Sequence, residues 1–287
     1  MDNELYSYSP ITERAATPLP DGKRLAFYVG LNIEHFLFGS PATSNTAVTA
    51  GLTPDPLNHG WRDYGTRVGI WRMMDLFDEV GLRASAITNS GVCQHYPQII
   101  EAGVERDWAW VAHGQTNSIL HTGMDEDAEA AFLDEMLRVF DAALPKRPQG
   151  WLGPALTETA ATPRLLHQRG FTYLLDWCCD DRPFPLLQPG MISVPYSLDV
   201  NDIGVFVQKA TTGSAYEEMV MDQFEVLLAE GGAVMALPVH PFVTGQPFRF
   251  KYLARILRTI TSTPEVWVTT SADIAERYLA SADGLDA

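Results

Sequence analysis

Leu25–His35 reads LAFYVGLNIEH, and this stretch decides the fold class. Its first part, Leu25–Leu31, is an unbroken run of apolar residues and glycine, which is typical of a strand buried on both faces of a parallel sheet. The polar residues Asn32, Glu34 and His35 follow at once. In parallel α/β barrels the reacting groups lie just past the C-terminal ends of the strands. The stretch therefore predicts a buried parallel strand that leads into a functional site.

The same pattern recurs along the chain after this strand. Short apolar runs alternate with longer segments whose apolar residues fall at helical spacing, and this alternation indicates βαβ units. The sequence predicts α/β architecture, as a distorted (β/α) barrel of seven or eight parallel strands. The predicted strands are Leu25–Leu31, Ala84–Thr88, Trp108–Ala112, Gly150–Leu152, Thr172–Leu175, Met191–Val194, Val234–Leu237 and Val266–Thr269.

Helices are predicted between these strands from their spacing and from capping residues at their ends. They are Val68–Val80 closed by Gly81, Tyr96–Ala102 closed by Gly103, Glu126–Leu144 behind Asp125, Thr162–Arg169, Tyr216–Glu230, Arg249–Thr261, and Ser271–Leu279 behind a Ser cap. Two segments, Ser40–Trp61 and Asp176–Gly190, interrupt the alternation with proline and polar residues. Loops of this length in a compact enzyme are often lids or subunit contacts.

The 287 residues fit one barrel domain, since such barrels commonly need about 250 residues. Residues 1–22 are rich in Pro, Ser and Thr and predict an N-terminal surface arm, and residues 23–287 form a single catalytic barrel. We expect the arm to need a partner for order. The arm and the two long loops together lead us to expect a homo-oligomer.

The chain carries a formal net charge of −16, which opposes binding to nucleic acid and to anionic membrane surfaces. The sequence has no apolar run long enough to span a membrane and no basic, apolar leader at its start. Its three cysteines, two of them adjacent, do not suggest a disulfide framework. We therefore expect a cytoplasmic protein whose partners are a small-molecule substrate and further copies of itself.

Imidazole, carboxylate and amide groups recur after the predicted strands, at the end where the loops of a barrel converge. The catalytic candidates are Glu34, His113, Asp176 and His240. The candidate substrate-binding residues are Asn32, His35, Asn117, Trp151, Tyr196, Asp202 and Arg249. Taken singly, Glu34 could be a surface ion-pair partner, His113 a core histidine and Asp176 a turn cap. His240 follows the apolar run VMALPV, so its side chain emerges from a buried strand.

The residues at this end favour general acid–base chemistry over other mechanisms. No GxSxG, GxGxxG or GxxxxGK[ST] motif is present, which disfavours a serine nucleophile and a phosphate-binding loop. His113 and Asn117 are four residues apart and His121 would continue the same helical face, but asparagine is a poor zinc ligand. We expect no cofactor, with zinc at Glu34, His113 and Asn117 or His121 as the alternative. Glu34 would activate water, His240 would protonate a departing nitrogen, and His113 with Asn117 would orient the carbonyl.

The chain resembles the polysaccharide deacetylase (NodB-homology) superfamily, and within it the branch of cofactor-independent allantoinases. The resemblance covers about Arg24 to Ala275. It rests on LNIEHF from Leu31, WRDYGTRVGIWR from Trp61, His113-Gly114, Gly150-Trp151, Asp180–Pro183, VPYSLDVNDI from Val194 and HPFVTGQPFR from His240. The resemblance implies a distorted barrel that hydrolyses a C–N bond, by deacetylating amino sugars or opening a ureide ring. It also implies assembly into a tetramer, because the enzymes that the chain resembles form tetramers.

Two departures from the metal-dependent members point to the metal-free branch. Those members carry an aspartate pair after the first strand, where this chain has Asn32 and Glu34, and two histidines where it has His113 and Asn117. They also hold the base aspartate with an arginine that the segment from Trp151 lacks. The resemblance thus favours a metal-free hydrolase of a small amide, imide or ureide. A metal-dependent amino-sugar deacetylase and a catalytically inactive barrel with a binding or assembly role are the alternatives.

Overall fold

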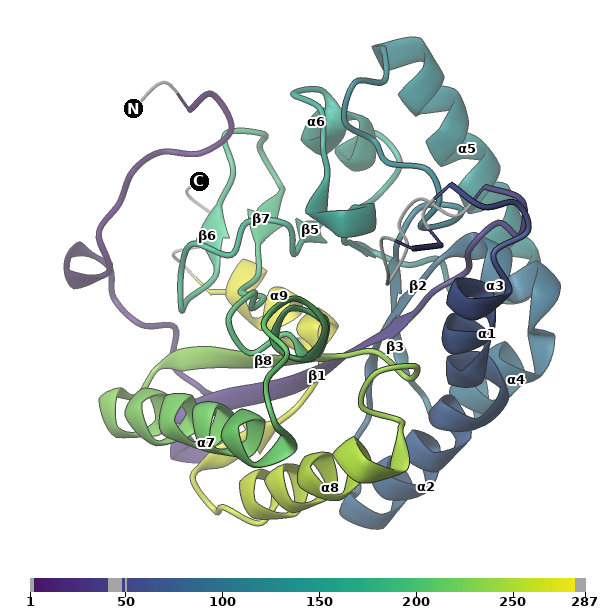
Figure 1. Ribbon diagram of the computed structural model, residues 1–287. Helices are drawn as coiled ribbons and strands as arrows, with labels where there is room; N and C mark the ends of the chain where they lie inside the picture. The colour runs from purple at the N-terminus through teal and green to yellow at the C-terminus, as the bar shows by residue number, and fades with distance from the viewer. Residues whose placement is uncertain (1–2, 41–47, 50, 282–287) are drawn as a thin grey trace.

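One curled, mostly parallel sheet carries the fold in the computed structural model, which describes residues 3–40, 48–49 and 51–281 (Figure 1). The strands follow the order β6-β7-β5-β4-β3-β2-β1-β8, with β9 also paired to β1, and only β6 runs antiparallel to its neighbour. The strands are β1 Leu25–Ile33, β2 Ser85–Thr88, β3 Ala109–Ala112, β4 Gly150–Trp151, β5 Tyr173–Leu174, β6 Phe184–Pro185, β7 Ile192–Ser193, β8 Ala233–Val239 and β9 Val266–Val268. The eight predicted strands all form, and the distorted (β/α) barrel is confirmed.

Side-chain alternation along β1 and β8 separates two cores. Phe27, Val29 and Leu31 pack outward under the helices, whereas Ala26 and Tyr28 pack in a second cluster within the barrel. Successive strand residues point to opposite faces, so the even-numbered set of β1 continues inward to Asn32 and Glu34. The same alternation in β8 carries the inward set from Val234 and Ala236 to His240.

The helices mostly cover the outer face of the sheet (Figure 1). They are α1 Pro56–Tyr64, α2 Ile70–Val80, α3 Ser90–His95, α4 Pro97–Glu105, α5 Glu126–Ala143, α6 Thr162–His167, α7 Gly213–Glu230, α8 Pro247–Thr261 and α9 Ser271–Leu279, with π-helical turns at Gly65–Gly69 and Ile203–Gln208. The Asp125 cap and the Gly81 closing residue form as expected.

Several details of the predicted helices were wrong. The segment Ser40–Trp61 is not entirely loop, because α1 begins at Pro56 behind an Asp55 cap; positions 41–47 and 50 lie outside the described residues. Gly103 lies inside α4, where a Cβ would approach the Trp108 ring to 2.7 Å, so tight packing against the indole explains the glycine. The cap of α9 is Thr270.

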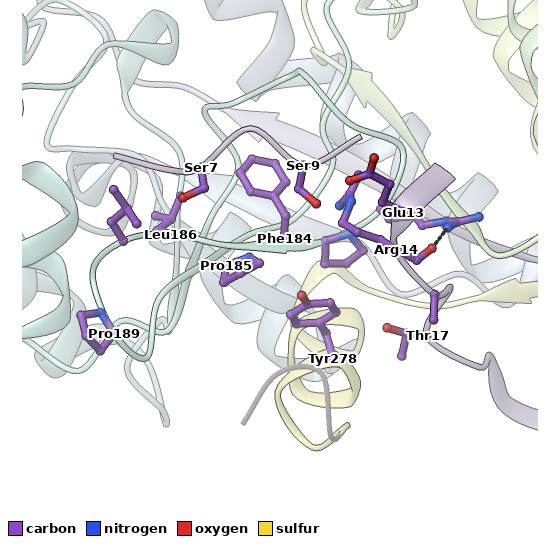
Figure 2. A pocket seen from close by; sticks show the side chains of 14 residues that line it. Ser7, Ser9, Glu13, Arg14, Thr17, Phe184, Pro185, Leu186, Pro189 and Tyr278 are labelled. Atoms are coloured by element: carbon purple, nitrogen blue, oxygen red, sulfur yellow. Dashed lines mark hydrogen bonds between the residues drawn. The ribbon is translucent and has the colours of Figure 1, made fainter. Parts of the chain in front are cut away.

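The N-terminal arm docks on its own chain, so the expectation that order there needs a partner was wrong. Tyr6 contacts the rings of Trp177 and Phe184 edge-on, each at 5.2 Å between centroids. Arg14 pairs with Asp180. Between the arm, β6 and α9 lies a cavity of about 480 Å³ whose lining includes Ser7, Ser9, Glu13, Phe184, Pro185 and Tyr278 (Figure 2). None of the described helices is long and apolar enough to cross a membrane.

Candidate active site

Glu34 lies at the centre of the candidate site, at the end of β1. Its Oε1 atom is 3.4 Å from Nε2 of His240, which follows β8, and 3.8 Å from Nε2 of His113, which follows β3. Asn117 donates its amide N–H to the same carboxylate oxygen. The side chains of the three ionisable residues are 2–6% exposed. The structure therefore brings Glu34, His113 and His240 together, as the sequence predicted.

Asp202 holds His240 from behind. Its Oδ1 lies 2.6 Å from Nδ1 of His240, and its Oδ2 accepts hydrogen bonds from the His240 backbone N–H and from the Thr244 hydroxyl. This arrangement fixes the imidazole with Nδ1 toward Asp202 and Nε2 toward Glu34. Asp202 was predicted to bind substrate, but it is fully buried and instead positions His240.

The charges on Glu34 and His240 stabilise each other. Burial alone would raise the pKa of Glu34, but the positive charge of His240, with further polar interactions from His113 and His240, outweighs it and lowers the pKa to about 2. Burial alone would lower the pKa of His240, but the charges of Asp202 and Glu34 raise it to about 10. At neutral pH the pair is thus a carboxylate and an imidazolium, the states that a base and an acid need.

His113 and Asp176 lie on the other side of Glu34. The Nδ1 atom of His113 is 2.6 Å from the Leu152 carbonyl oxygen, which a ring N–H at Nδ1 satisfies, so Nε2 faces Glu34. Asp176 accepts a hydrogen bond from the Gly153 backbone N–H. Burial raises the pKa of Asp176 to about 6, and burial together with Asp176 raises the pKa of Glu158 well above its usual value. Two neighbouring buried carboxyl groups therefore share the side of the site behind His113.

Asn117 reaches the site by a different route from the one we predicted. The residues from His113 to His121 form a loop, so the helical spacing inferred for His113, Asn117 and His121 was wrong. The loop is held by hydrogen bonds from Asn117 N and Thr116 Oγ1 to the His35 carbonyl oxygen. His121 lies apart, with its Nδ1 atom 3.3 Å from Oε1 of Glu129.

The other predicted substrate-binding residues lie on two different faces of the sheet, some inside the barrel and some outside it. Asn32 and Tyr196 point into the barrel and hydrogen-bond to each other, at 3.1 Å from Asn32 Nδ2 to the Tyr196 hydroxyl. His35 and Trp151 point outward, so their assignment to the substrate site was wrong. His35 stacks on His95 of α3, and Trp151 packs on His121 and Phe171 in the core.

Arg249 also lies off the Glu34 group. Its guanidinium lies over the rings of Phe206 and Phe248, and Nη1 donates to the Val243 carbonyl oxygen. Its charge still interacts with that of Asp202. Arg249 therefore supports the segment that follows His240, and its contacts within the described part of the chain are with Phe206, Phe248 and Val243 rather than with Glu34.

Sequence reasoning missed four residues beside the site: Asn89, Thr244, Glu158 and Arg62. Asn89 directly follows β2. Arg62 on α1 is 9% exposed, lies 3.6 Å over the Phe36 ring and interacts with the charge of Glu34. Thr244 and Glu158 lie on loops, where no periodicity points to them. The available signals were the WRDYG string, which contains Arg62, and the HPFVT string, which contains Thr244.

The residues do not fit the zinc ion that metal-dependent relatives would hold. Asn117 turns its NH2 group to Glu34, because its Oδ1 atom accepts a hydrogen bond from Asn89, so it offers no oxygen toward His113. A zinc site needs three or four N, O or S donors directed at one point. Among the described residues, no group of three or more His, Cys, Asp or Glu side chains is arranged to hold a metal.

Comparisons with known proteins agree with the resemblance drawn from the sequence. No protein-family profile matches the chain. A Schizosaccharomyces pombe protein described as a candidate polysaccharide deacetylase is 25% identical over 96% of this chain and 98% of its own length. A crystal structure described as a probable polysaccharide deacetylase from Pseudomonas aeruginosa is 25% identical, with a TM-score of 0.84 over 95% of this chain and 96% of its own. PuuE allantoinase is 26% identical, with a TM-score of 0.83 over the same shares.

Proposed function

We propose, from the premise that the chain has the polysaccharide deacetylase-like hydrolase fold and resembles its allantoinase-containing branch, that it hydrolyses a non-peptide C–N bond in a small amide, imide or ureide. The observation that carries this proposal is the buried Glu34–His240 pair with Asp202 behind it. Such a pair supplies a base for water and an acid for a leaving nitrogen at one point. A binding or assembly role gives these buried charges no purpose.

The reaction balances within these groups. Glu34 accepts a proton from water as the water oxygen bonds to the carbonyl carbon, while His113 Nε2 and the Asn117 amide lie beside the reacting carbonyl. The C–N bond then breaks as the nitrogen takes the Nε2 proton of His240, which leaves a carboxylic acid and an amine. The proton on Glu34 returns across the 3.4 Å gap to His240, which restores the starting pair.

Proton transfer from His240 also strengthens Glu34 as a base. The imidazolium is the main group that lowers the pKa of Glu34, so Glu34 becomes more basic once His240 gives its proton to the nitrogen. The low resting pKa keeps Glu34 ionised until water attacks, and the rise, which comes as the C–N bond breaks, keeps the proton taken from water on Glu34. This coupling fits hydrolysis of a bond whose leaving nitrogen requires protonation.

We propose that no metal takes part, since Asn117 directs its NH2 group toward the position between Glu34 and His113. A zinc-dependent amino-sugar deacetylase would need an oxygen or imidazole donor there. This donor set supports a small amide, imide or ureide as the substrate rather than a polysaccharide.

The test is a panel of allantoin, hydantoin, dihydrouracil and N-acetylglucosamine oligomers, with wild type beside Glu34→Gln, His240→Asn and the double variant. We expect turnover of a ring amide or ureide and a loss of about 10²- to 10⁴-fold in each single variant, the usual contribution of one acid or base. The double variant should lose little more, because the two groups act as one unit. Turnover of only the sugar oligomers, or near-wild-type turnover in His240→Asn, would contradict the proposal.

A further inference from the structure

Asn89, the residue that follows β2, connects three segments of the site. Its Oδ1 atom accepts a hydrogen bond of 2.8 Å from the backbone N–H of His35. Its Nδ2 atom donates to the carbonyl oxygen of His113 and, at 2.9 Å, to Oδ1 of Asn117. The side chain is fully buried, and every contact leads to a residue beside Glu34. Asn89 thus joins the chain after β1, the chain after β3 and the loop that carries Asn117.

The orientation of the Asn89 amide follows from the chemistry of its neighbours. A backbone N–H needs an acceptor, so the oxygen of Asn89 must face His35. The two oxygens on the other side, of His113 and Asn117, need donors, and the NH2 group supplies both hydrogens. Exchanging the oxygen and nitrogen would oppose like groups at all three contacts.

The same reasoning fixes the Asn117 amide. Since its Oδ1 atom accepts from Asn89, its NH2 group must face the Glu34 carboxylate. Hydrogen bonds therefore run in one direction, from His35 N–H through Asn89 and Asn117 to Glu34. The ionised Glu34 carboxylate only accepts hydrogen bonds, so Asn89 and Glu34 favour the same orientation of the Asn117 amide, and Asn89 holds the far end of that amide in place.

We infer that Asn89 is a positioning residue, which fixes the Asn117 amide with its NH2 group toward Glu34 and so keeps a donor on the base. A hydrogen bond from a neutral amide to a carboxylate favours the ionised form. Asn89 also ties the backbone of His113, after β3, to the backbone of His35, after β1. It sets the direction of Asn117 without itself touching the reacting groups.

The inference rests on the proposed function only in calling Glu34 the base, and its test needs no substrate. The probe is the pH titration of the Glu34 side-chain carboxyl, followed by ¹³C NMR in wild type, Asn89→Ala, Asn117→Ala and the double variant. We expect each single variant to raise the pKa of Glu34, since each removes the oriented donor. The double variant should titrate like Asn117→Ala alone, because Asn89 acts through Asn117.

Thr162→Ala is the matched control, because it removes a buried donor from a different carboxylate, Glu129, and should leave the Glu34 titration unchanged. If Asn89→Ala does not fold, Asn89→Ser keeps a side chain favoured before a helix but is too short to reach Asn117. A Glu34 titration unchanged in the Asn89 variant, or single shifts that add in the double variant, would overturn the inference. Once a substrate is found, kcat should fall about 10- to 100-fold with little change in KM, a loss of the size seen when a side chain that orients a metal ligand is removed.

Discussion

At the scale of single residues, Asp202 contributes most to keeping His240 protonated. Burial favours the neutral imidazole, and the charges of Asp202 and Glu34 overcome it to raise the pKa of His240 to about 10. An acid of this kind works below its pKa and fails as pH rises through it. The raised pKa also adds stability that is fully present below the ordinary histidine pKa of about 6.5 and is lost as pH rises toward 10.

Asp202→Asn should therefore move the alkaline limb of the rate profile to lower pH. The amide keeps the shape of the side chain but removes the negative charge that contributes most to raising the pKa of His240. The measurement is kcat/KM against pH in wild type and variant. Glu129→Gln is the control, because it alters a carboxylate beside a buried histidine, His121, outside the site. An alkaline limb at the same pH in Asp202→Asn would show that His240 is not the acid.

The position of single residues could be predicted from the sequence only where strand alternation applies. Glu34, His113 and His240 follow buried strands on the inward set, so listing what comes after each strand found them. His35 follows β1 and Trp151 lies in β4, both on the outward set, and parity along each strand would have excluded them. Asn89 and Glu158 act through contacts between loops, which no spacing in the chain reveals.

At the scale of helices and loops, the close contact between the start of α2 and the loop that follows His240 fixes the position of that loop. A Cβ on Gly69 would lie 2.0 Å from the Pro241 carbonyl oxygen, and one on Gly245 would lie 2.1 Å from the same atom. The backbone segments therefore meet without room for a side chain. This contact helps to place His240, which directly precedes Pro241.

Gly69→Ala should push the His240 loop away from α2. We expect a loss of stability of roughly 1–3 kcal/mol, the usual cost of overpacking, and a fall in kcat larger than unfolding explains. Thermal unfolding and kcat measured well below the transition separate the two effects. Gly39→Ala is the control, since its Cβ would meet no atom within 4 Å. Full activity in Gly69→Ala would show that this contact does not position His240.

Helices were predictable where they are long and amphipathic, as with α5 and α8. The short helix α3 has too few residues for its periodicity to stand out. Helix α1 was missed because Pro, Asn and Gly dominate its surroundings, although Asp55 followed by Pro56 is a helix-start signal. Local end signals thus carried information that composition obscured.

The whole molecule combines a barrel with an arm that packs against the segment 176–190, which was predicted as a long loop but contains β6. Tyr6 and Arg14 of the arm contact Trp177, Phe184 and Asp180 in the segment 176–190. The composition of the arm predicted that it lies on the surface but not where it docks, because its contacts are with residues far away in the sequence. That segment begins at Asp176, so the arm contacts a segment that starts beside the candidate site.

Assembly is a separate prediction at this scale. We expect a homo-oligomer, with a tetramer as the candidate, through surfaces that include the long loops. Light scattering at micromolar concentration measures the mass. It should be done at about 0.15 M salt, where screening over roughly 8 Å limits repulsion between copies of charge −16. A monomer under these conditions would contradict the prediction.

Catalysis by Glu34 and His240 without a metal is the central claim, and turnover of metal-stripped protein tests it most directly. The protein is treated with a chelator, its zinc content is measured, and kcat is determined on the substrate found in the panel before and after zinc is added. We predict unchanged kcat in the stripped protein and no gain on adding zinc, because Asn117 faces Glu34 with its NH2 group. Activity that disappears with the metal and returns with stoichiometric zinc would contradict the account.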